Sequence, residues 1–438
     1  MLNFVNSGRN TQKLVVGEFL YTAKWTSKEN IKTWRCENRM CTSTVKTQND
    51  TFINEPGAHN HDPITGKTEV AAIRDEIRAS ATRSEDPPVR IVSRLASNVS
   101  LASASQLPLV SSITREIRRI RQSQMNEIPR LRLEQTTEGY PFLRIKHNNL
   151  YIFAAATDVE WLSRCVDWFA DGTFKTVPHE FMQMYTIHGF DGERTRPCIF
   201  ALMSRRTLSD YEQLLGNILM LFPFLRPLRI MLDFEQAAIT AFQTAFPHAT
   251  VNGCAFHFNQ SLWRSIQRNC LAAQYNTDTV LRNQVSLLFA LPYVHPEHVF
   301  EAFLMIKQQS TPALANVLKY FERMYVGRLT RRGVSQPSFS HLFWNLSYRA
   351  LFGIPRTNNA VEGFHNKFRC IIGAPHPPLS LFMRKLSEVQ HLNSLPNQTQ
   401  HTRHATTHNA LGATVFSFTR SRIMEYLSDV STLLHVSQ

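Results

Sequence analysis

Residues 141–270 alternate short apolar runs with amphipathic segments, and this order limits the folds open to the chain. Strands are predicted at 150–155, 166–175, 181–190 and 197–203, with a hairpin turn at Asp191-Gly192 between the last two. A helix at 211–222 follows, then a strand at 229–234, a helix at 235–246 and a strand at 250–256. A strand meander continued by helix–strand–helix–strand predicts a mixed α/β sheet.

Three carboxylates stand at positions that this order makes informative. Asp171 and Asp233 each end an apolar strand, and strand ends that border a cleft are where α/β proteins place reacting groups. Glu362 follows Asn358 and Asn359, either of which can cap a helix, so it falls in a first helical turn. Each acid alone is more often a turn or cap residue. Together they would repel one another unless cations lay between them, which predicts a site for Mg²⁺ or Mn²⁺.

Residues 1–63 are rich in short β-like runs and contain four side chains that bind metals, Cys36, Cys41, His59 and His61. The segment is too small to be stable on so thin a core, so a staple is expected. Two thiolates and two imidazoles are the ligand set of a closed tetrahedral Zn²⁺ site. A His-x-His pair suits an extended segment, in which alternate side chains point the same way. The other interpretation is two buried cysteines and two surface histidines.

Residues 64–140 form a Ser-, Ala- and Arg-rich region, which we interpret as a basic helical linker. Apolar residues have helical spacing at 70–82 and 111–125. In the second of these helices, Arg115, Arg118, Arg119 and Arg121 fall largely off the apolar face. They indicate either contacts with DNA phosphates or a solvated helical face.

The charge balance favours a polyanionic partner. Lys and Arg number 48 against 34 Asp and Glu, a formal net charge of +14, and nucleic acid is the commonest partner for such a balance. Of the seven cysteines only Cys36 and Cys41 are closely spaced, which argues against a disulfide framework and fits a reducing compartment. We expect neither a membrane span nor a signal peptide, and Arg118-Arg119-Ile120-Arg121 is a candidate nuclear import signal.

Residues 271–350 predict an all-α insertion, with helices over 281–291, 296–309 and 311–325. Residues 141–270 are then the first part of a core and residues 351–390 its C-terminal helix, followed by a polar tail, 391–438, with a last helix at 414–434. Four arginines of this part are candidates for DNA contact: Arg328, Arg331, Arg332 and Arg349.

The N-terminal segment contains Lys13-Leu14-Val15, Gly17 with Phe19 and Tyr21, Trp34-Arg35-Cys36, Cys41, and His59-Asn60-His61-Asp62-Pro63. With these residues it resembles a FLYWCH-type zinc finger. The resemblance places the Zn²⁺ ligands on Cys36, Cys41, His59 and His61, and it implies recognition of DNA or protein.

Four further blocks follow in order along the chain. They are Asp171-Gly172-Thr173-Phe174-Lys175, Leu232-Asp233 opening onto a helix, Cys254-Ala255-Phe256-His257-Phe258 with Trp263, and Arg356-Thr357-Asn358-Asn359-Ala360-Val361-Glu362-Gly363-Phe364-His365. With them, residues from about 150 to 390 resemble a Mutator-like element (MULE) transposase, a DDE enzyme with a ribonuclease-H-like fold. The resemblance places the catalytic carboxylates, which bind Mg²⁺ or Mn²⁺, on Asp171, Asp233 and Glu362. It also marks Cys254 and His257 as auxiliary residues near the site.

Three residues beside these acids have more than one interpretation. Glu235 is either an auxiliary ligand or a first-turn helix residue facing the helix dipole. His257 positions a phosphate or a metal-bound water, or it fills a polar slot. Cys254 with His257 lacks two further ligands for a second zinc site.

The resemblance implies a nuclear transposase whose partner is double-stranded DNA, both element ends and target, bound by a homo-oligomer. The finger and the Arg-rich region would hold DNA, while the core would use water to cut a strand and then the exposed 3′-hydroxyl to attack target DNA. Two other functions stay open. One is a domesticated DNA-binding transcriptional regulator with an inactive core, and the other is a standalone structure-specific nuclease, which shares the acids but would not need the finger.

Overall fold

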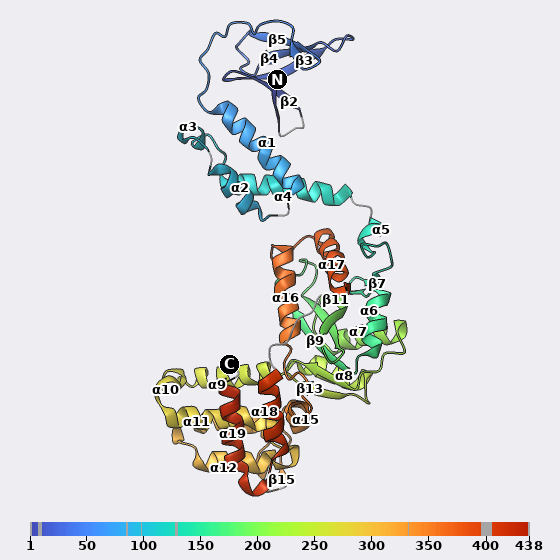
Figure 1. Cartoon of the computed structure of the whole chain (residues 1–438), viewed down its shortest axis with the longest axis vertical. Coiled ribbons are helices and arrows are strands. Elements are labelled where there is room, and N and C mark those ends of the chain that lie inside the picture. The colour runs from blue at the N-terminus through green and yellow to red at the C-terminus, as the bar shows by residue number, and fades with distance from the viewer. Residues whose placement is uncertain are drawn as a thin grey trace. The chain divides into compact units, whose positions relative to one another are not determined.

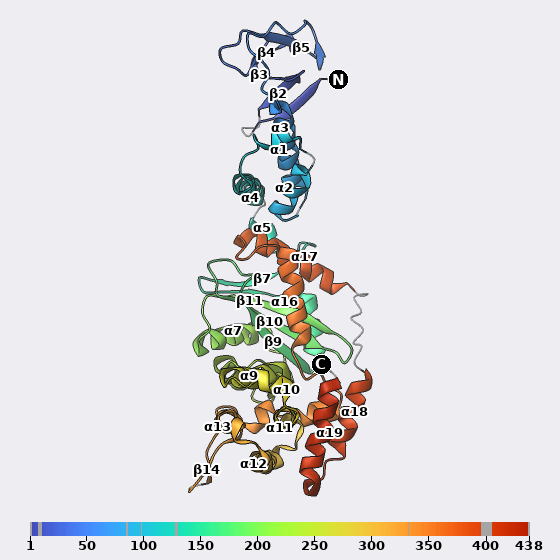
Figure 2. The same ribbon diagram turned by 90° about the vertical axis from the view of Figure 1, so that its left-hand side faces the viewer.

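The computed structural model describes residues 2–7, 11–84, 86–97, 99–127, 130–331, 333–395 and 405–436, so the predicted contact residue Arg332 lies outside the described residues. The chain divides into two compact units, residues 1–129 and residues 130–438 (Figures 1 and 2). Across the described ranges, none of the helices combines the length and the apolar character that crossing a membrane requires.

The first unit begins with an antiparallel sheet whose six strands pair in chain order. These strands are β1 (Asn3–Asn6), β2 (Gln12–Val16), β3 (Phe19–Thr26), β4 (Lys32–Cys36), β5 (Thr44–Gln48) and β6 (Thr51–Phe52). Its core is small and is built mainly on Leu14, Tyr21, Trp34 and Val45, next to the buried side chains of Cys36 and Cys41. So few large apolar side chains explain why the sheet needs an additional link.

Four helices complete the first unit: α1 (Lys67–Arg83), α2 (Pro88–Ala96), α3 (Leu101–Ala104) and α4 (Val110–Glu127). Helices α1, α2 and α4 pack around Ile77, Ile91, Ile113 and Ile117. The four-residue step between the last two is the apolar spacing that predicts a helix there. The helices predicted at 70–82 and 111–125 are therefore confirmed.

A seven-stranded mixed sheet organises the second unit, in the order β13-β12-β9-β10-β11-β8-β7. Its strands are β7 (Leu143–His147), β8 (Leu150–Phe153), β9 (Asp167–Thr173), β10 (Gln183–Phe190), β11 (Thr195–Met203), β12 (Arg229–Leu232) and β13 (Thr250–Gly253). Strand β10 pairs antiparallel with β9 and β11, whereas β12 runs parallel to β9 and β13 parallel to β12. The predicted mixed α/β sheet is confirmed.

One predicted strand ends early. The prediction for 250–256 is wrong beyond Gly253, because helix α9 (Ala255–Arg268) begins two residues later. Ala255, Phe258 and Leu262 are buried at helical spacing, and this amphipathic pattern starts within the apolar run that suggested a strand.

Helices cover both faces of the sheet. Successive side chains along its strands point to opposite faces, and each face packs in its own apolar layer. Helices α6 (Ala156–Arg164), α7 (Leu208–Leu221) and α8 (Gln236–Ala245) pack in one layer. Helices α16 (Asn359–Ile372) and α17 (Leu379–Ser394) pack in the other, together with the short α5 (Arg130–Leu133), and Figure 2 shows α16 and α17 alongside the sheet. On β11, Ile199 and Ala201 enter the first layer and Phe200 and Leu202 the second.

The remaining helices form an all-α region. They are α9, α10 (Ala272–Thr277), α11 (Thr279–Ala290), α12 (Val299–Gln309), α13 (Ala315–Phe321), α14 (His341–Trp344), α15 (Ser347–Leu351), α18 (Ala405–Phe416) and α19 (Ile423–Val436). Short turns of helix (Leu291–Tyr293, Pro296–His298, Pro312–Leu314, Glu322–Val326 and Arg420–Arg422) and a hairpin of β14 (Leu329–Thr330) and β15 (Gly333–Val334) connect them. Helix α18 packs on α15 and α19 on α11, so most of the described part of the polar tail is helical and belongs to this region (Figure 1). The prediction of a single helix at 414–434 is wrong, because residues 417–419 separate the end of α18 from the helical residues that follow.

The arginines of this region differ in their environments. Arg349 of α15 is only 1% exposed, so it does not lie on the open surface of the protein. Arg328 lies 3.8 Å from a carboxylate oxygen of Glu322, and both Arg328 and Arg331 are exposed.

Candidate functional site

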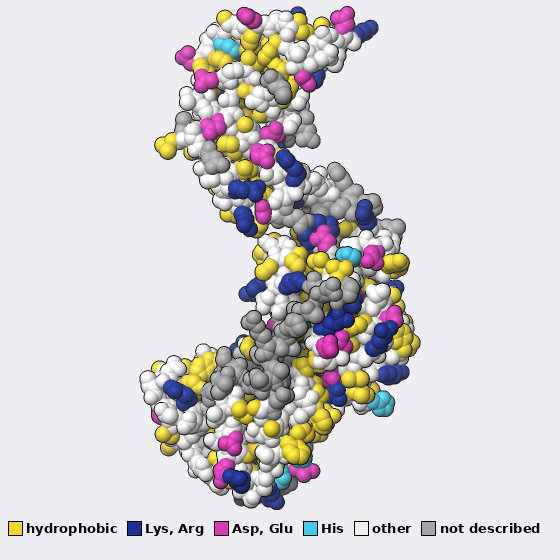
Figure 3. Space-filling model, in the orientation of Figure 1, with side chains coloured by type: hydrophobic (Ala, Val, Ile, Leu, Met, Phe, Trp, Pro, Cys, Tyr) yellow, Lys and Arg dark blue, Asp and Glu magenta, His cyan; other side chains and the backbone are white. Residues whose placement is uncertain are grey.

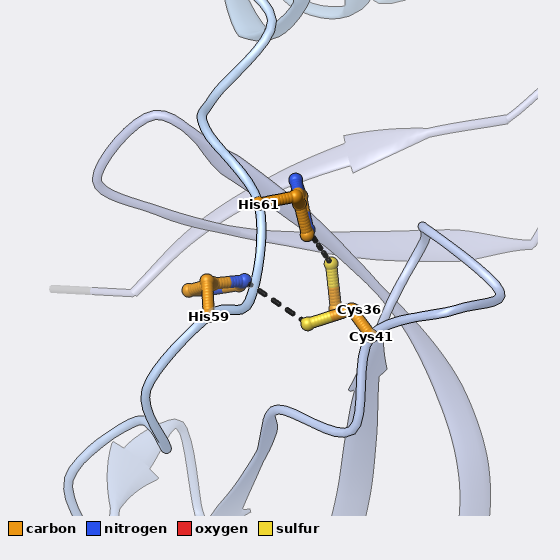
Figure 4. A group of neighbouring side chains, drawn as sticks. All are labelled: Cys36, Cys41, His59 and His61. Carbon is orange, nitrogen blue, oxygen red and sulfur yellow. Dashed lines mark hydrogen bonds between the residues drawn. The ribbon is translucent and has the colours of Figure 1, made fainter.

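Two cysteines and two histidines converge beside the sheet of the first unit (Figure 4). Cys36 ends β4, Cys41 precedes β5, and His59 and His61 follow β6 on a segment that is neither helix nor strand. The Sγ atom of Cys36 lies 3.4 Å from Nε2 of His61, and the Sγ atom of Cys41 lies 3.4 Å from Nδ1 of His59. One ligand atom from each of the four residues lies within 4.8 Å of the other three.

These distances fit a tetrahedral Zn²⁺ site. Zn–S bonds of about 2.3 Å and Zn–N bonds of about 2.0–2.1 Å give a tetrahedral S···N edge of about 3.6 Å. The second ring nitrogens are also held, because Tyr21 Oη lies 2.7 Å from His59 Nε2 and the Asp62 carbonyl oxygen lies 2.9 Å from His61 Nδ1. Such outer contacts fix which nitrogen faces a metal. Burial also lowers the pKa of His59, which favours the neutral imidazole that a metal requires, so the group supports Zn²⁺.

The acids of the second unit lie on neighbouring parallel strands. Asp171 lies in β9 and Asp233 directly follows β12, and each comes two residues after the paired positions Phe169 and Met231. Cys254 follows β13, the next parallel strand. Because the carboxyl ends of parallel strands meet at one edge of a sheet, these side chains are brought to the same place.

Glu362 reaches this edge from helix α16. Ligand atoms of Asp171, His257 and Glu362 lie within 4.8 Å of one another, and His257 Nε2 lies 3.8 Å from Glu362 Oε1. Asp233 is not a member of this group of three, but its negative charge is the largest charge effect on Asp171. Asp171, Asp233 and Glu362 are far apart in the chain but form one acidic cluster.

The cluster is electrostatically strained in the metal-free protein. The pKa of Asp171 is raised to about 8, chiefly by burial, with the charges of Asp233 and Glu362 adding to it. Burial followed by the charge of Glu235 raises the pKa of Asp233 to about 6, against the opposing effect of Arg206. The Oδ1 atom of Asp233 is buried and has no hydrogen-bond partner in the part of the chain that the structure describes. A divalent cation would relieve the repulsion and give this oxygen a partner, so the residues present fit Mg²⁺ or Mn²⁺.

Asn358 fixes the start of α16 and with it the position of Glu362. This residue is fully buried, its backbone N–H donates to Cys254 Sγ at 3.2 Å, and its side-chain Nδ2 donates to the Ala170 carbonyl at 3.3 Å. It occupies the N-cap position that the sequence predicts for Asn358 or Asn359, but its side chain forms no cap hydrogen bond. The amide instead ties the helix to β9, the strand that carries Asp171.

The auxiliary residues divide into different roles. Burial raises the pKa of Cys254 to about 11, so it is a neutral thiol that accepts a hydrogen bond, and it joins no metal-ligand group among the described residues. Burial lowers the pKa of His257, and its buried Nδ1 has no hydrogen-bond partner within the described ranges. Glu235 is the N-cap residue of α8, and its carboxylate accepts a 3.1 Å hydrogen bond from Arg206 Nε, which engages it away from a ligand role.

A buried polar network next to Asp171 is not predicted from the sequence. Thr186 of β10 pairs with Asp171, and its hydroxyl lies 2.9 Å from His365 Nε2 and 3.0 Å from His188 Nε2. Burial lowers the pKa of His365 to about 4 and that of His188 well below its ordinary value, so both imidazoles are neutral. The available signal is Thr186 and His188, two polar residues on one face of a largely apolar strand.

Two protein-family models match the chain. The FLYWCH zinc finger domain matches residues 4–61, and the MULE transposase domain matches residues 168–261. The chain carries both domains. No curated protein matches it. The resemblances that the sequence motifs carry are therefore confirmed.

The MULE transposase domain match includes Asp171, Asp233, Cys254 and His257, whereas Glu362 lies beyond its last residue. The structure brings Glu362 to the matched part through α16. Glu362 therefore lies beside Asp171 and His257 because of the tertiary fold, although it is far from the matched residues in the chain.

Beyond the FLYWCH zinc finger, helix α4 presents an arginine surface, by which we mean Arg115, Arg118 and Arg119. All three side chains are exposed and have no ion-pair partner in the described ranges. Figure 3 shows Lys and Arg side chains gathered over α2 and α4. Arg121 differs, because its guanidinium donates hydrogen bonds to the carbonyls of Ala81, Ser84 and Asp86 and holds α4 within the unit.

Proposed function

We propose that the second unit is the catalytic core of a DDE-type DNA transposase, which cuts DNA strands and joins them to target DNA with divalent metal ions. The observation that carries this proposal is the convergence of Asp171, Glu362 and His257, with Asp233 beside them. The strand order β11-β10-β9-β12-β13, three antiparallel strands extended by two parallel ones, supports a ribonuclease-H-like fold. The match to the MULE transposase domain supports a transposase-related function.

Asp171, Asp233 and Glu362 would hold two Mg²⁺ or Mn²⁺ ions, which activate an attacking oxygen and stabilise the leaving oxygen in phosphodiester chemistry. The protein itself supplies position and charge. Asn358 holds the helix of Glu362 against β9, so the acids are aligned before DNA arrives. His257, a neutral imidazole beside Glu362, is placed to hydrogen-bond a DNA phosphate oxygen.

The FLYWCH zinc finger and the arginine surface would hold the DNA. Three exposed guanidiniums that have no ion partner among the described residues can contact phosphates, and each phosphate contact steepens the salt dependence of binding. Replacing Arg115, Arg118 and Arg119 with glutamine should make the negative slope of log K against log salt shallower, by roughly 0.9 for each lost contact. An unchanged slope would remove these residues from the DNA interface.

The direct test uses the purified full-length protein, DNA that includes the sequence flanking its gene, and Mn²⁺. Wild-type protein should nick this DNA and join ends, and Glu362→Gln should abolish both products. Glu388→Gln is the matched control, because Glu388 is also a partly exposed helical glutamate but lies on α17, where it pairs with Arg384 and Lys385. Cutting that persists in Asp171→Asn and Glu362→Gln would show that the assignment is wrong.

A DNA-binding regulator with an inactive core is the second candidate. The observation that favours it is the first unit, whose Cys/His group and arginine surface need no carboxylate cluster to hold DNA. Wild-type protein that binds DNA but cuts none with either Mg²⁺ or Mn²⁺ would support this function instead.

A further inference from the structure

A pocket of the second unit lies at the other end of the strands that carry the acids. It has a volume of about 580 Å³, and its lining includes Arg229 and Thr250, the first residues of β12 and β13. Asp233 follows the last residue of β12, and a four-residue strand spans roughly 13 Å. The pocket is therefore separate from the acidic cluster.

The wall of this pocket carries an excess of positive charge. Arg229 and Arg349 both line it. Arg229 donates two hydrogen bonds, of 2.7 and 2.6 Å, to the buried carboxylate of Asp167, and Arg349 Nη2 lies 3.5 Å from the same carboxylate. Two guanidiniums thus share one carboxylate. The three groups together have a net charge of +1, which an anion would balance.

One side-chain nitrogen of Arg349 lies in an ion pair but forms no hydrogen bond within the described part of the chain. The residue is 1% exposed, its Nε donates to Asn252 Oδ1 at 3.2 Å, and its Nη1 donates to the Pro355 carbonyl at 2.9 Å. Its buried Nη2 has the 3.5 Å ion pair with Asp167 Oδ1 but no hydrogen-bond partner among the described residues. A buried donor of this kind is the feature expected where a ligand oxygen completes the set.

An aromatic ring stands at the rim of the same pocket. Tyr348 is 53% exposed, its ring centroid lies 4.5 Å from that of Phe352, and the guanidinium carbon of Arg229 lies 6.0 Å from it. A planar, partly exposed ring beside two guanidiniums can stack a base while the cations hold a phosphate. The pocket volume lies within the range of about 300–1,000 Å³ that is usual for small-molecule sites.

We propose that this pocket binds a nucleotide, with the phosphate at Arg349 and Arg229 and the base against Tyr348. The same chemistry has two sources, a free nucleotide or an unpaired nucleotide turned out of a DNA duplex. The site goes beyond strand cutting and uses none of the three acids. Its binding can therefore be measured without Mg²⁺ or Mn²⁺, so its failure is distinguishable from failure of the proposed catalytic function.

The test uses the full-length, zinc-loaded protein without added Mg²⁺ or Mn²⁺. Calorimetry compares dAMP with inorganic phosphate, and fluorescence anisotropy compares a duplex that has one extrahelical nucleotide with the fully paired duplex. Tyr348→Ala should weaken binding by about 10-fold or more, because stacking on an aromatic ring contributes much of the affinity for a base. The matched control is Tyr140→Ala, another exposed tyrosine of the same unit, 64% exposed and outside the pocket, which should bind as the wild type does.

The outcomes separate the two sources. Tighter binding of dAMP than of phosphate, lost in Tyr348→Ala, supports a free nucleotide as the ligand. A preference for the extrahelical nucleotide over the paired duplex, lost in the same variant, supports the DNA source. Three outcomes overturn the proposal. They are equal affinity for phosphate and dAMP, equal effects of the two tyrosine variants, and no saturable binding of any probe. Tyr348 is exposed, so its replacement leaves the buried Arg349–Asp167 pair in place and the variant should fold.

Discussion

Replacing Asp171 with asparagine should stabilise the metal-free protein while it removes a proposed catalytic group. Burial and neighbouring charge raise the pKa of Asp171 from 3.8 to about 8, which means that folding disfavours the ionised carboxylate. Burying this carboxyl group does not lower the free energy of unfolding below about pH 4. The free energy of unfolding then falls as the pH rises from about 4 to about 8. Asparagine cannot ionise, and its side-chain oxygen can still accept the 2.7 Å hydrogen bond from the Gly172 N–H.

The magnitude follows from the difference between the folded and unfolded pKa values. One pH unit corresponds to about 1.36 kcal/mol, so a rise from 3.8 to about 8 gives an upper limit of about 5 kcal/mol at pH 8. The same relation gives about 1.7 kcal/mol at pH 5. Because Asp233 and Glu362 can shift or take up protons, we expect a measured gain of about 1–3 kcal/mol at pH 8 and about a third of that at pH 5.

The assay is urea unfolding of the full-length protein at pH 5 and pH 8, with zinc retained and no other divalent cation. Adding Mg²⁺ at pH 8 should stabilise the wild type more than Asp171→Asn, because a cation relieves the same repulsion.

Asp167→Asn is the matched control, the same chemical change at the start of the same strand. Asp167 accepts two hydrogen bonds from Arg229, so this variant should lose about 3–5 kcal/mol at both pH values. The reasoning fails if Asp171→Asn destabilises the protein at pH 8, or if its effect is the same at both pH values.

Three further changes test other parts of the structure. Cys36→Ser should remove zinc and unfold the first unit, measured by metal content and circular dichroism, and a folded wild type without zinc would contradict this. Gly253→Ala would place a Cβ atom 2.8 Å from the Phe234 ring, so it should cost about 1–3 kcal/mol in urea unfolding, and an unchanged midpoint would show that the contact relaxes freely. Asn358→Ala should lower the free energy of unfolding by about 1–2 kcal/mol, because the hydrogen bond to the Ala170 carbonyl is lost. It should reduce Mn²⁺-dependent cutting far more than this loss of stability suggests, and wild-type cutting would exclude a positioning role.

The sequence is most informative where a local pattern has a local physical cause. The central strands are predicted because apolar runs of strand length end at turn residues, and β9 to β12 follow these runs closely. The start of α9 is missed because Cys254, Ala255 and Phe256 fit either an apolar strand or the first turn of an amphipathic helix. Only packing against the all-α region decides between them.

Interactions between distant segments cannot be predicted in the same way. No local pattern indicates that the Asn358 amide reaches the Ala170 carbonyl, or that Thr186 meets His365. For the same reason Arg349 looks like a surface arginine in the sequence, although the structure buries it beside a carboxylate.

The sequence by itself determined the ligand chemistry, namely two thiolates with two imidazoles in the first 63 residues and three carboxylates at strand and helix ends. Residue type and local spacing fix these properties, since a carboxylate or thiolate is a potential ligand wherever the chain places it. The tertiary structure alone decided which of these groups meet, how deeply they are buried and therefore how strongly their charges interact. Burial beside other carboxylates raises the pKa of Asp171, and this depends on strands and helices that are joined only by the fold.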